Sequence, residues 1–323
     1  MLVRSSIAAM FDRYQAPELN VSEWYNTAPL TMDSLRGKVV VVDFWTYSCI
    51  NCLRTLPHMK QIWSRYKDQG LVLIGVHSPE FEFEKDRKNV EAAIMRHGLE
   101  YPIGVDNDFQ TWNAFHNQYW PAQYFIDKEG DVRHIHEGEG GEGEIEAWIV
   151  RLLRDAGRNV HLPEIKDSVV QYQRDMTPET YAGSVRNQGI GNSPVCAEDE
   201  GCRYSDAMPH RPGVIYLDGN WLQDREYLQL VQGDGKIILS YRATEVYVVM
   251  SSDAPIEVEV LLDGKPLQRS QAHQDVSFRN GRTFVTVERD DMYYVVKTRS
   301  LEGHELALRG PAGRLRVYAY TFG

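Results

Sequence analysis

The sequence contains no run of eighteen apolar residues, so no segment of it is expected to span a bilayer. Positive charge is also scarce, because 35 lysines and arginines stand against 46 aspartates and glutamates and leave a net charge of -11. No basic patch stands out that would neutralise phosphates, which argues against nucleic acid as a partner. The apolar run within residues 1–10 is too short to predict a signal peptide.

Cysteine is rare as well, with four in 323 residues, and Cys49 and Cys52 form a single CxxC motif. A tetrahedral structural zinc site needs four ligands, and the sequence has neither a second CxxC nor an HxxxH motif. His134 and His136 alternate on a predicted strand, but a third and a fourth ligand cannot be named. We therefore expect no metal site and no cofactor.

The CxxC motif follows an apolar stretch, residues 38–45, that is predicted to form a buried strand. A helix that begins at the motif places the sulfur of Cys49 at its N-terminus, where unpaired amides and the helix dipole favour a thiolate. Cys49 is therefore the predicted nucleophile. Cys52, one turn further along, can attack a mixed disulfide on Cys49 and release the partner. This arrangement predicts thiol-disulfide exchange.

Asp43 lies six residues before Cys49, near the end of the same predicted strand. If its carboxyl is buried beneath Cys52, its pKa rises and it can carry the proton that Cys52 gives up. The alternative is that Asp43 ends the strand and faces solvent. The apolar residues around it favour the interior position.

These features resemble the thioredoxin superfamily across residues 20–155. The matching features are the Val-Asp-Phe-Trp lead, the CxxC motif, the helix proline Pro57 and a later X-Pro before a strand. The resemblance implies that Pro121, in Trp120-Pro121, is a cis-proline whose loop faces the CxxC motif and docks an extended substrate. Spacing alone also fits an ordinary trans proline in a turn, since few X-Pro bonds are cis.

Two further residues are candidates for the substrate site. Trp45 is expected to flank the active-site turn as in thioredoxins, with a core position as the alternative. Glu80 follows the next strand, where a loop glutamate is a sufficient interpretation and an acidic group beside the active site, as in the TlpA/ResA group, is the alternative. The expected substrate-binding residues are therefore Trp45, Trp120, Pro121 and Glu80.

A closer resemblance lies in residues 45–57, which are similar to the active-site segment of DipZ-type proteins, and in residues 317–323, which are similar to the end of the same family's second domain. In this family the soluble region follows a membrane electron-transfer segment, and this sequence contains no such segment. The resemblance implies an extracytoplasmic reductase, in the periplasm or cell envelope. It would pass electrons from a membrane donor of the CcdA/DsbD type to disulfide-containing proteins.

The order of elements predicts an α/β thioredoxin-like domain over 20–155 and an all-β antiparallel sandwich over 213–323. In the first domain we expect strands at 38–45, 71–77, 122–127 and 131–136, and helices at 50–68, 84–97, 108–116 and 142–155. In the second, turn signals separate short strands at Asp218-Gly219-Asn220, Gly233-Asp234-Gly235, Asp263-Gly264 and Asn280-Gly281. The resemblance implies a jelly-roll like a carbohydrate-binding module, with a glycan as a further candidate ligand.

The stretch between the domains, residues 156–212, lacks sustained periodicity and is predicted to be a linker. It holds Cys196 and Cys202, whose separation permits a local disulfide. A structural bond is the expected interpretation, with a second redox centre or two free thiols as alternatives.

Three functions remain open from the sequence. The first is a thiol-disulfide oxidoreductase, which explains the most residues. The second is a thiol peroxidase, suggested by Thr46 three residues before Cys49 as in the peroxiredoxin motif, although Val42 replaces the proline of that motif. The third is a glycan-binding or partner-binding protein with a non-catalytic thioredoxin fold.

Overall fold

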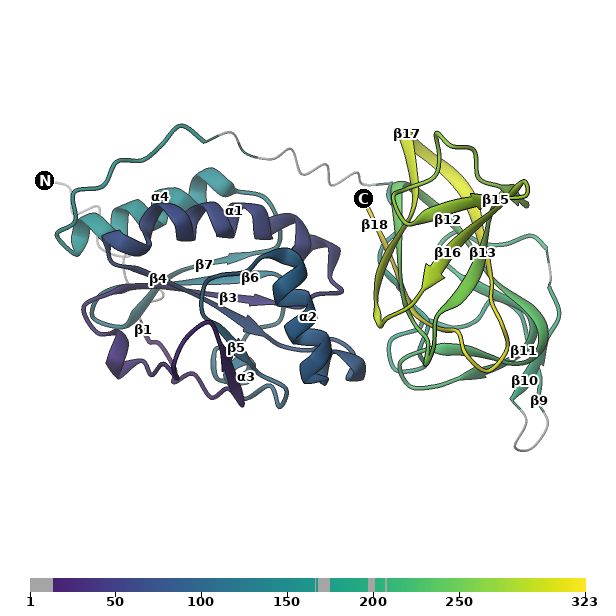
Figure 1. Ribbon diagram of the computed structural model, residues 1–323, viewed down its shortest axis with the longest axis horizontal. Helices are drawn as coiled ribbons and strands as arrows, with labels where there is room; N and C mark the ends of the chain where they lie inside the picture. Colours follow the sequence, from purple (N-terminus) through teal and green to yellow (C-terminus); the bar gives the residue numbers. More distant parts are fainter. Residues whose placement is uncertain (1–13, 166, 168–174, 197–200, 207) are drawn as a thin grey trace, which may run out of the picture. The chain divides into compact units, whose positions relative to one another are not determined.

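The computed structural model describes residues 14–165, 167, 175–196, 201–206 and 208–323 (Figure 1). The chain divides into two compact units, Met1–Gln171 and Tyr172–Gly323, and each is described by itself. In the described part of the chain, no helix combines the length and the apolar character needed to cross a membrane. The domain boundaries expected from the sequence stay predictions.

The first unit contains a seven-stranded mixed sheet in the order β1-β7-β6-β3-β4-β5-β2. Its strands are β1 (Tyr14–Gln15), β2 (Glu23–Tyr25), β3 (Val39–Trp45), β4 (Leu71–His77), β5 (Ile103–Val105), β6 (Ala122–Ile126) and β7 (Asp131–Glu137). Its helices are α1 (Ile50–Tyr66), α2 (Arg87–His97), α3 (Gln110–Ala114) and α4 (Glu142–Asp155), with 3-10 turns η1 (Asp33–Leu35), η2 (Lys67–Gln69) and η3 (Glu82–Lys85). The central strands β3, β4 and β5 are parallel, whereas β6 and β7 run antiparallel to their neighbours.

Strand β3 is buried along its whole length, and its side chains alternate between two cores. Val41 and Trp45 pack on the side that α1, α2 and α4 cover, while Val42 and Phe44 pack against α3 and its surroundings. Figure 1 shows α1 and α4 lying along the same face of the sheet. The alternation places Asp43 on the face of α1, which carries the CxxC motif.

The structure adds elements that the sequence pattern did not predict in this unit. Strands β1, β2 and β5 have two or three residues each, which is too short for an alternation to be recognised. The helix expected at 84–97 is divided into η3 and α2, because Asp86 accepts a hydrogen bond from Lys88 N and starts a new helix.

The second unit is all β, and every pair among its named strands is antiparallel. Its strands are β8 (Thr180–Tyr181), β9 (Val195–Cys196), β10 (Cys202–Tyr204), β11 (Ile215–Gln223), β12 (Leu228–Ser251), β13 (Ile256–Leu262), β14 (Lys265–Pro266), β15 (Val276–Arg279), β16 (Arg282–Val287), β17 (Asp291–Arg309) and β18 (Arg316–Phe322). An α/β unit followed by an antiparallel all-β unit confirms the predicted fold class at this level. Strands β8, β9 and β10 lie within the stretch that the sequence predicted as a linker.

Two of the four predicted turns in this unit are wrong. Asp263-Gly264 and Asn280-Gly281 do connect neighbouring strands, but Gly219 lies inside β11 and Gly233 inside β12. Gly219 has a φ of 105°, and the register between β11 and β12 shifts beside it. A Cβ there would meet the carbonyl oxygen of Asp234 at 2.8 Å, so this glycine serves a bulge within a long strand rather than a turn.

Candidate active site

The two cysteines of the CxxC motif lie where β3 gives way to α1. Cys49 immediately precedes the first turn of α1 and is partly exposed, whereas Cys52 is fully buried in that turn. The backbone N–H of Cys52 donates a hydrogen bond of 3.3 Å to Sγ of Cys49. The accessible sulfur is therefore the one that faces a backbone amide at the helix N-terminus.

Cys52 is chemically different from Cys49. Burial raises the pKa of Cys52 well above its usual range, and the neighbouring Cys49 and Asp43 add to the rise. A hydrogen bond from the Thr46 backbone acts in the opposite direction and lowers this pKa. At neutral pH Cys52 is therefore a thiol, and it must lose a proton before it can act as a nucleophile.

Asp43 is fully buried, which excludes the alternative that it faces solvent. Its Oδ1 accepts a hydrogen bond of 2.7 Å from Nε2 of Gln123, and Oδ2 has no hydrogen-bond partner among the described residues. Burial raises the pKa of Asp43 to about 7, although the hydrogen bond from Gln123 opposes the rise. Near neutral pH this carboxyl can therefore both release and accept a proton.

The Trp120-Pro121 peptide bond is cis, as the resemblance implied. The thiol of Cys49 donates to the carbonyl oxygen of Trp120 at 3.9 Å, so this loop borders the accessible sulfur. The Trp120 indole in turn donates a 3.0 Å hydrogen bond to the carbonyl oxygen of Ser78, which fixes the loop to the end of β4. Trp120 is half-buried and Pro121 is buried. Substrate docking by these two residues stays a prediction.

Trp45 lies in the core rather than at the surface of the site. Its side chain has no exposed area, and its ring meets the His77 ring edge-on with centroids 5.3 Å apart. A fully buried side chain cannot touch a substrate in this conformation. The structure therefore favours the core alternative for Trp45, which supports the active-site turn from below.

The acidic group that contacts the active-site turn is Glu84, which the sequence did not single out. Oε1 of Glu84 accepts hydrogen bonds from the Thr46 hydroxyl at 2.5 Å and from the Ser48 hydroxyl at 2.7 Å. Glu80, the predicted residue, is partly exposed, and its backbone N–H donates to Oε2 of Glu84. Glu84 lies four residues from the predicted position, in the acidic run of η3, where nothing in the sequence distinguishes the buried glutamate from the exposed ones.

His77 and Glu84 form a buried polar layer beneath the turn that precedes α1. It is fully buried, its Nε2 lies 3.3 Å from the Thr46 hydroxyl, and the Tyr47 ring stacks on it. Burial lowers the pKa of His77 to about 3, so its imidazole is neutral at physiological pH. The Thr46 hydroxyl is thus engaged by Glu84 and His77.

The structure brings a third residue to the histidines on β7. Donor atoms of His134, His136 and Glu144 all lie within 4.8 Å of one another. Nε2 of His134 is 3.3 Å from Oε1 of Glu144, whose side chain is 55% exposed, and burial lowers the pKa of His134, whose ring stacks on Trp148. The prediction that the chain holds no metal stays a prediction.

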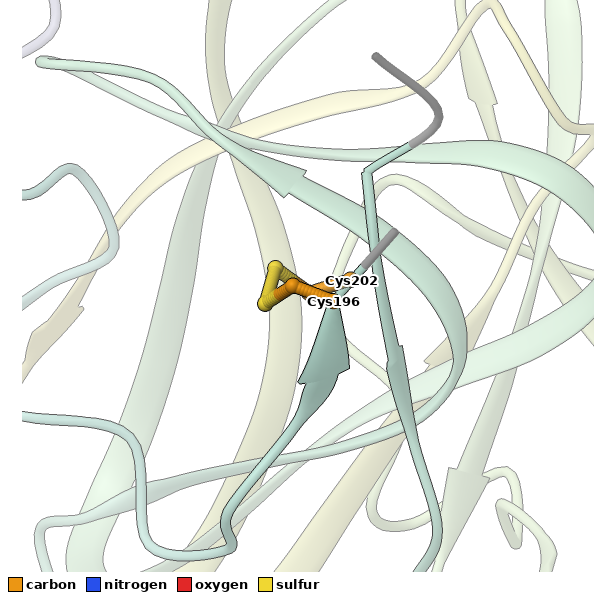
Figure 2. Close-up of a disulfide and its surroundings, with 2 residues drawn as sticks. All are labelled: Cys196 and Cys202. Atoms are coloured by element: carbon orange, nitrogen blue, oxygen red, sulfur yellow. A yellow bond between two sulfur atoms is a disulfide. The ribbon is translucent and has the colours of Figure 1, made fainter. Parts of the chain in front are cut away.

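Cys196 and Cys202 form a disulfide, which Figure 2 shows. The two residues lie directly opposite each other on β9 and β10, with their Cα atoms 4.1 Å apart. Cys202 also packs against the core of the second unit. The bond therefore joins two neighbouring strands of one sheet, which agrees with a structural role; that role stays a prediction.

Comparisons with protein families match the two parts of the chain separately. Residues 13–135 match the AhpC/TSA family, and residues 177–323 match a family described as the thioredoxin like C-terminal domain. Protein DipZ of Mycobacterium tuberculosis is 37% identical over 318 residues, which are 95% of this chain and 43% of that protein. The chain thus spans less than half the length of DipZ.

Shorter relatives match the first unit. The thiol-disulfide oxidoreductase YkuV of Bacillus subtilis is 32% identical over 144 residues, which are 44% of this chain and 97% of YkuV. The thiol-disulfide oxidoreductase ResA of Halalkalibacterium halodurans is 29% identical over 127 residues, 39% of this chain and 69% of that protein. These matches confirm the resemblance inferred from the CxxC segment. The chain therefore belongs to the thioredoxin-like thiol-disulfide oxidoreductases, the family of YkuV, and is similar to ResA and to part of DipZ.

Proposed function

We propose that Cys49 and Cys52 reduce disulfides of protein substrates, with Asp43 as the proton carrier. The observation that carries the proposal is the contrast between the two sulfurs. Cys49 is accessible and held at the N-terminus of α1, while Cys52 is buried next to a carboxyl whose pKa lies near 7. One sulfur is thus suited to attack a substrate and the other to release it.

The reaction divides into two exchanges. The Cys49 thiolate attacks one sulfur of the substrate disulfide, and the second substrate sulfur leaves as a thiolate that takes up a proton. Cys52 then loses its proton and attacks Sγ of Cys49, which frees the first substrate sulfur. Two electrons have passed to the substrate, which becomes a dithiol, and the chain now holds the Cys49–Cys52 disulfide.

Asp43 is proposed to serve the second exchange. Cys52 is a neutral thiol in a site that excludes water, so its proton needs an acceptor within the protein. Asp43 is buried and close enough for its charge to raise the pKa of Cys52, and its Oδ2 has no hydrogen-bond partner in the part of the chain that the structure describes. The ionised carboxylate accepts the proton, and the departing substrate thiolate takes it up as exchange is completed.

We place the protein outside the cytoplasm, with a membrane electron donor of the CcdA/DsbD type that reduces the pair again. The similarity to DipZ over 95% of this chain supports this placement. The Cys196–Cys202 disulfide supports it as well, because such bonds persist in oxidising compartments. In such a compartment a reduced CxxC pair requires a supply of electrons. Trp120, Pro121 and Glu80 are proposed to contact the substrate beside Cys49.

The match to the AhpC/TSA family keeps peroxide reduction as a second candidate. The position of Thr46 speaks against it, because its hydroxyl donates to Glu84. For the second unit, a jelly-roll architecture and glycan binding remain proposals. Several large aromatic side chains of the second unit are buried and so are not available to stack on a sugar, namely Trp221, Tyr241, Tyr247, Tyr293 and Tyr318.

The proposal is tested by mixing the dithiol form of the protein with insulin, and in parallel with hydrogen peroxide. We expect stoichiometric reduction of insulin disulfides together with formation of the Cys49–Cys52 disulfide. The new disulfide is detected by mass spectrometry of the peptide that contains both residues. Peroxide should oxidise the pair no faster than it oxidises a simple thiol. Rapid peroxide oxidation without insulin reduction would replace the reductase proposal by the peroxidase one.

A further inference from the structure

The buried carboxyl group of Glu84 accepts several hydrogen bonds through both of its oxygens. Oε1 accepts from the hydroxyls of Thr46 and Ser48 and, at 3.2 Å, from the backbone N–H of Ser48. Oε2 accepts from the backbone N–H groups of Glu80 and Phe81, the latter at 3.0 Å. Its side chain has no exposed area. One carboxyl thus ties the turn before α1 to the segment that follows β4.

The residues on the Oε1 side, Thr46 and Ser48, are each linked to one of the two cysteines. Ser48 directly precedes Cys49 and is buried. Thr46 contributes the backbone hydrogen bond that lowers the pKa of Cys52. The hydroxyls of Thr46 and Ser48 both donate hydrogen bonds to Oε1 of Glu84, so this one oxygen atom helps to position the backbone of residues 46–48.

We propose that Glu84 is a positioning residue for thiol-disulfide exchange, which holds the turn 46–48 so that the Thr46 amide stays directed at Cys52 and Cys49 stays at the start of α1. The inference rests on the proposed function of the Cys49–Cys52 pair. It assigns Glu84 no contact with substrate. A purely structural alternative exists, because Oε2 also holds the amides of residues 80 and 81.

The surroundings of Glu84 disfavour its ionised form. Burial raises its pKa to about 7, the negative charge of Glu80 adds to the rise, and the hydrogen bonds from Thr46, Ser48 and Phe81 oppose it. His77, the other titratable group in this layer, is neutral. Buried ionisable groups of this kind gather at functional sites.

The test measures the equilibrium between the Cys49–Cys52 dithiol and disulfide in glutathione or dithiothreitol buffers, using the full chain and mass spectrometry of the Cys49–Cys52 peptide. Glu84→Ala should shift this equilibrium about tenfold toward the disulfide, because the dithiol form loses the aligned amide donor at Cys52. A tenfold shift equals about 30 mV for a two-electron couple. Ser48→Ala, which leaves the Oε2 contacts intact, should shift it in the same direction by a smaller factor.

Glu146→Ala is the matched control. Glu146 is a fully buried glutamate of the same unit, and it bonds Arg65 and Tyr66 at the other end of α1. Glu84→Ala and Glu146→Ala should both lower thermal stability. Only Glu84→Ala and Ser48→Ala should shift the equilibrium between dithiol and disulfide. Equal effects in Glu84→Ala and Glu146→Ala, no shift in Ser48→Ala, or a shift toward the dithiol would each overturn the inference. If the wild-type pair forms no disulfide at all, the proposed function fails instead.

Discussion

Replacing Cys49 by serine should reduce the rate of protein-disulfide reduction at least about a thousandfold, since losing a catalytic nucleophile costs this much or more in other enzymes. Cys49 is partly exposed at the N-terminus of α1 and is the proposed nucleophile, whereas Cys52 is buried and out of reach of a substrate. The measurement is the initial rate of insulin disulfide reduction at pH 7 with dithiothreitol as electron donor.

Two companion variants make this result specific. Cys52→Ser retains the attacking sulfur but lacks the resolving one, so a mixed disulfide between Cys49 and the substrate should accumulate and be visible on a non-reducing gel. The double variant Cys196→Ser/Cys202→Ser should keep the wild-type rate, because this bond lies within the sheet of the second unit. Unchanged activity in Cys49→Ser would favour the hypothesis that the CxxC motif is not catalytic. A large loss in the double variant would instead make Cys196–Cys202 a second redox centre.

Asp43→Asn should slow disulfide exchange but raise the free energy of unfolding. The amide keeps the oxygen that accepts from Gln123 but cannot take a proton from Cys52. We expect release of the mixed disulfide to slow by about a hundredfold, the lower range for loss of a general base. The slow step is measured by following how fast Cys52 resolves a mixed disulfide that has been preformed on Cys49.

The stability effect of Asp43→Asn follows from the raised pKa. A pKa of about 7 in the folded chain, against an ordinary 3.8, means that the folded state binds more protons than the unfolded state between these pH values. Stability therefore falls as pH rises from about 4 to about 7 and then stays low, with a penalty on the order of 4 kcal/mol. Asp43→Asn removes this penalty.

The variant should thus gain about 2 to 4 kcal/mol in unfolding free energy at pH 8 and little at pH 4, measured by urea denaturation. Glu84 titrates in the same range in both proteins, so the comparison between them isolates Asp43. A variant that is less stable than the wild type at pH 8 would show that the folded state stabilises the Asp43 carboxylate, which contradicts a pKa raised by burial.

Much of the redox site could be predicted because its parts are close in sequence. The buried strand 39–45, the helix start at Cys49 and the position of Cys52 one turn later all follow from local pattern. The interior position of Asp43 follows as well, since a strand that is apolar on both faces leaves it nowhere else to point. The cis form of Trp120-Pro121 could not be derived from spacing and rested on resemblance alone.

Glu84 and the long strands of the second unit could not be predicted, because both depend on partners far along the chain. Glu84 reaches Thr46 across 38 positions, and its neighbours Glu80 and Glu82 offer the same chemistry in sequence. Likewise, the glycines of β11 and β12 look like turn residues until the partner strand is known. A glycine that serves a bulge and one that serves a turn are distinguished only by what lies opposite.

The measurement that tests the central claim most directly is the reduction potential of the Cys49–Cys52 pair. It is obtained by equilibrating the Cys196→Ser/Cys202→Ser variant with glutathione or dithiothreitol buffers and trapping the thiols. A value near that of thioredoxin, about -270 mV, is the result that a reductase of protein disulfides predicts. A value near about -120 mV, as for a strong disulfide donor, would contradict the proposed reductase function and make the chain an oxidant of thiols.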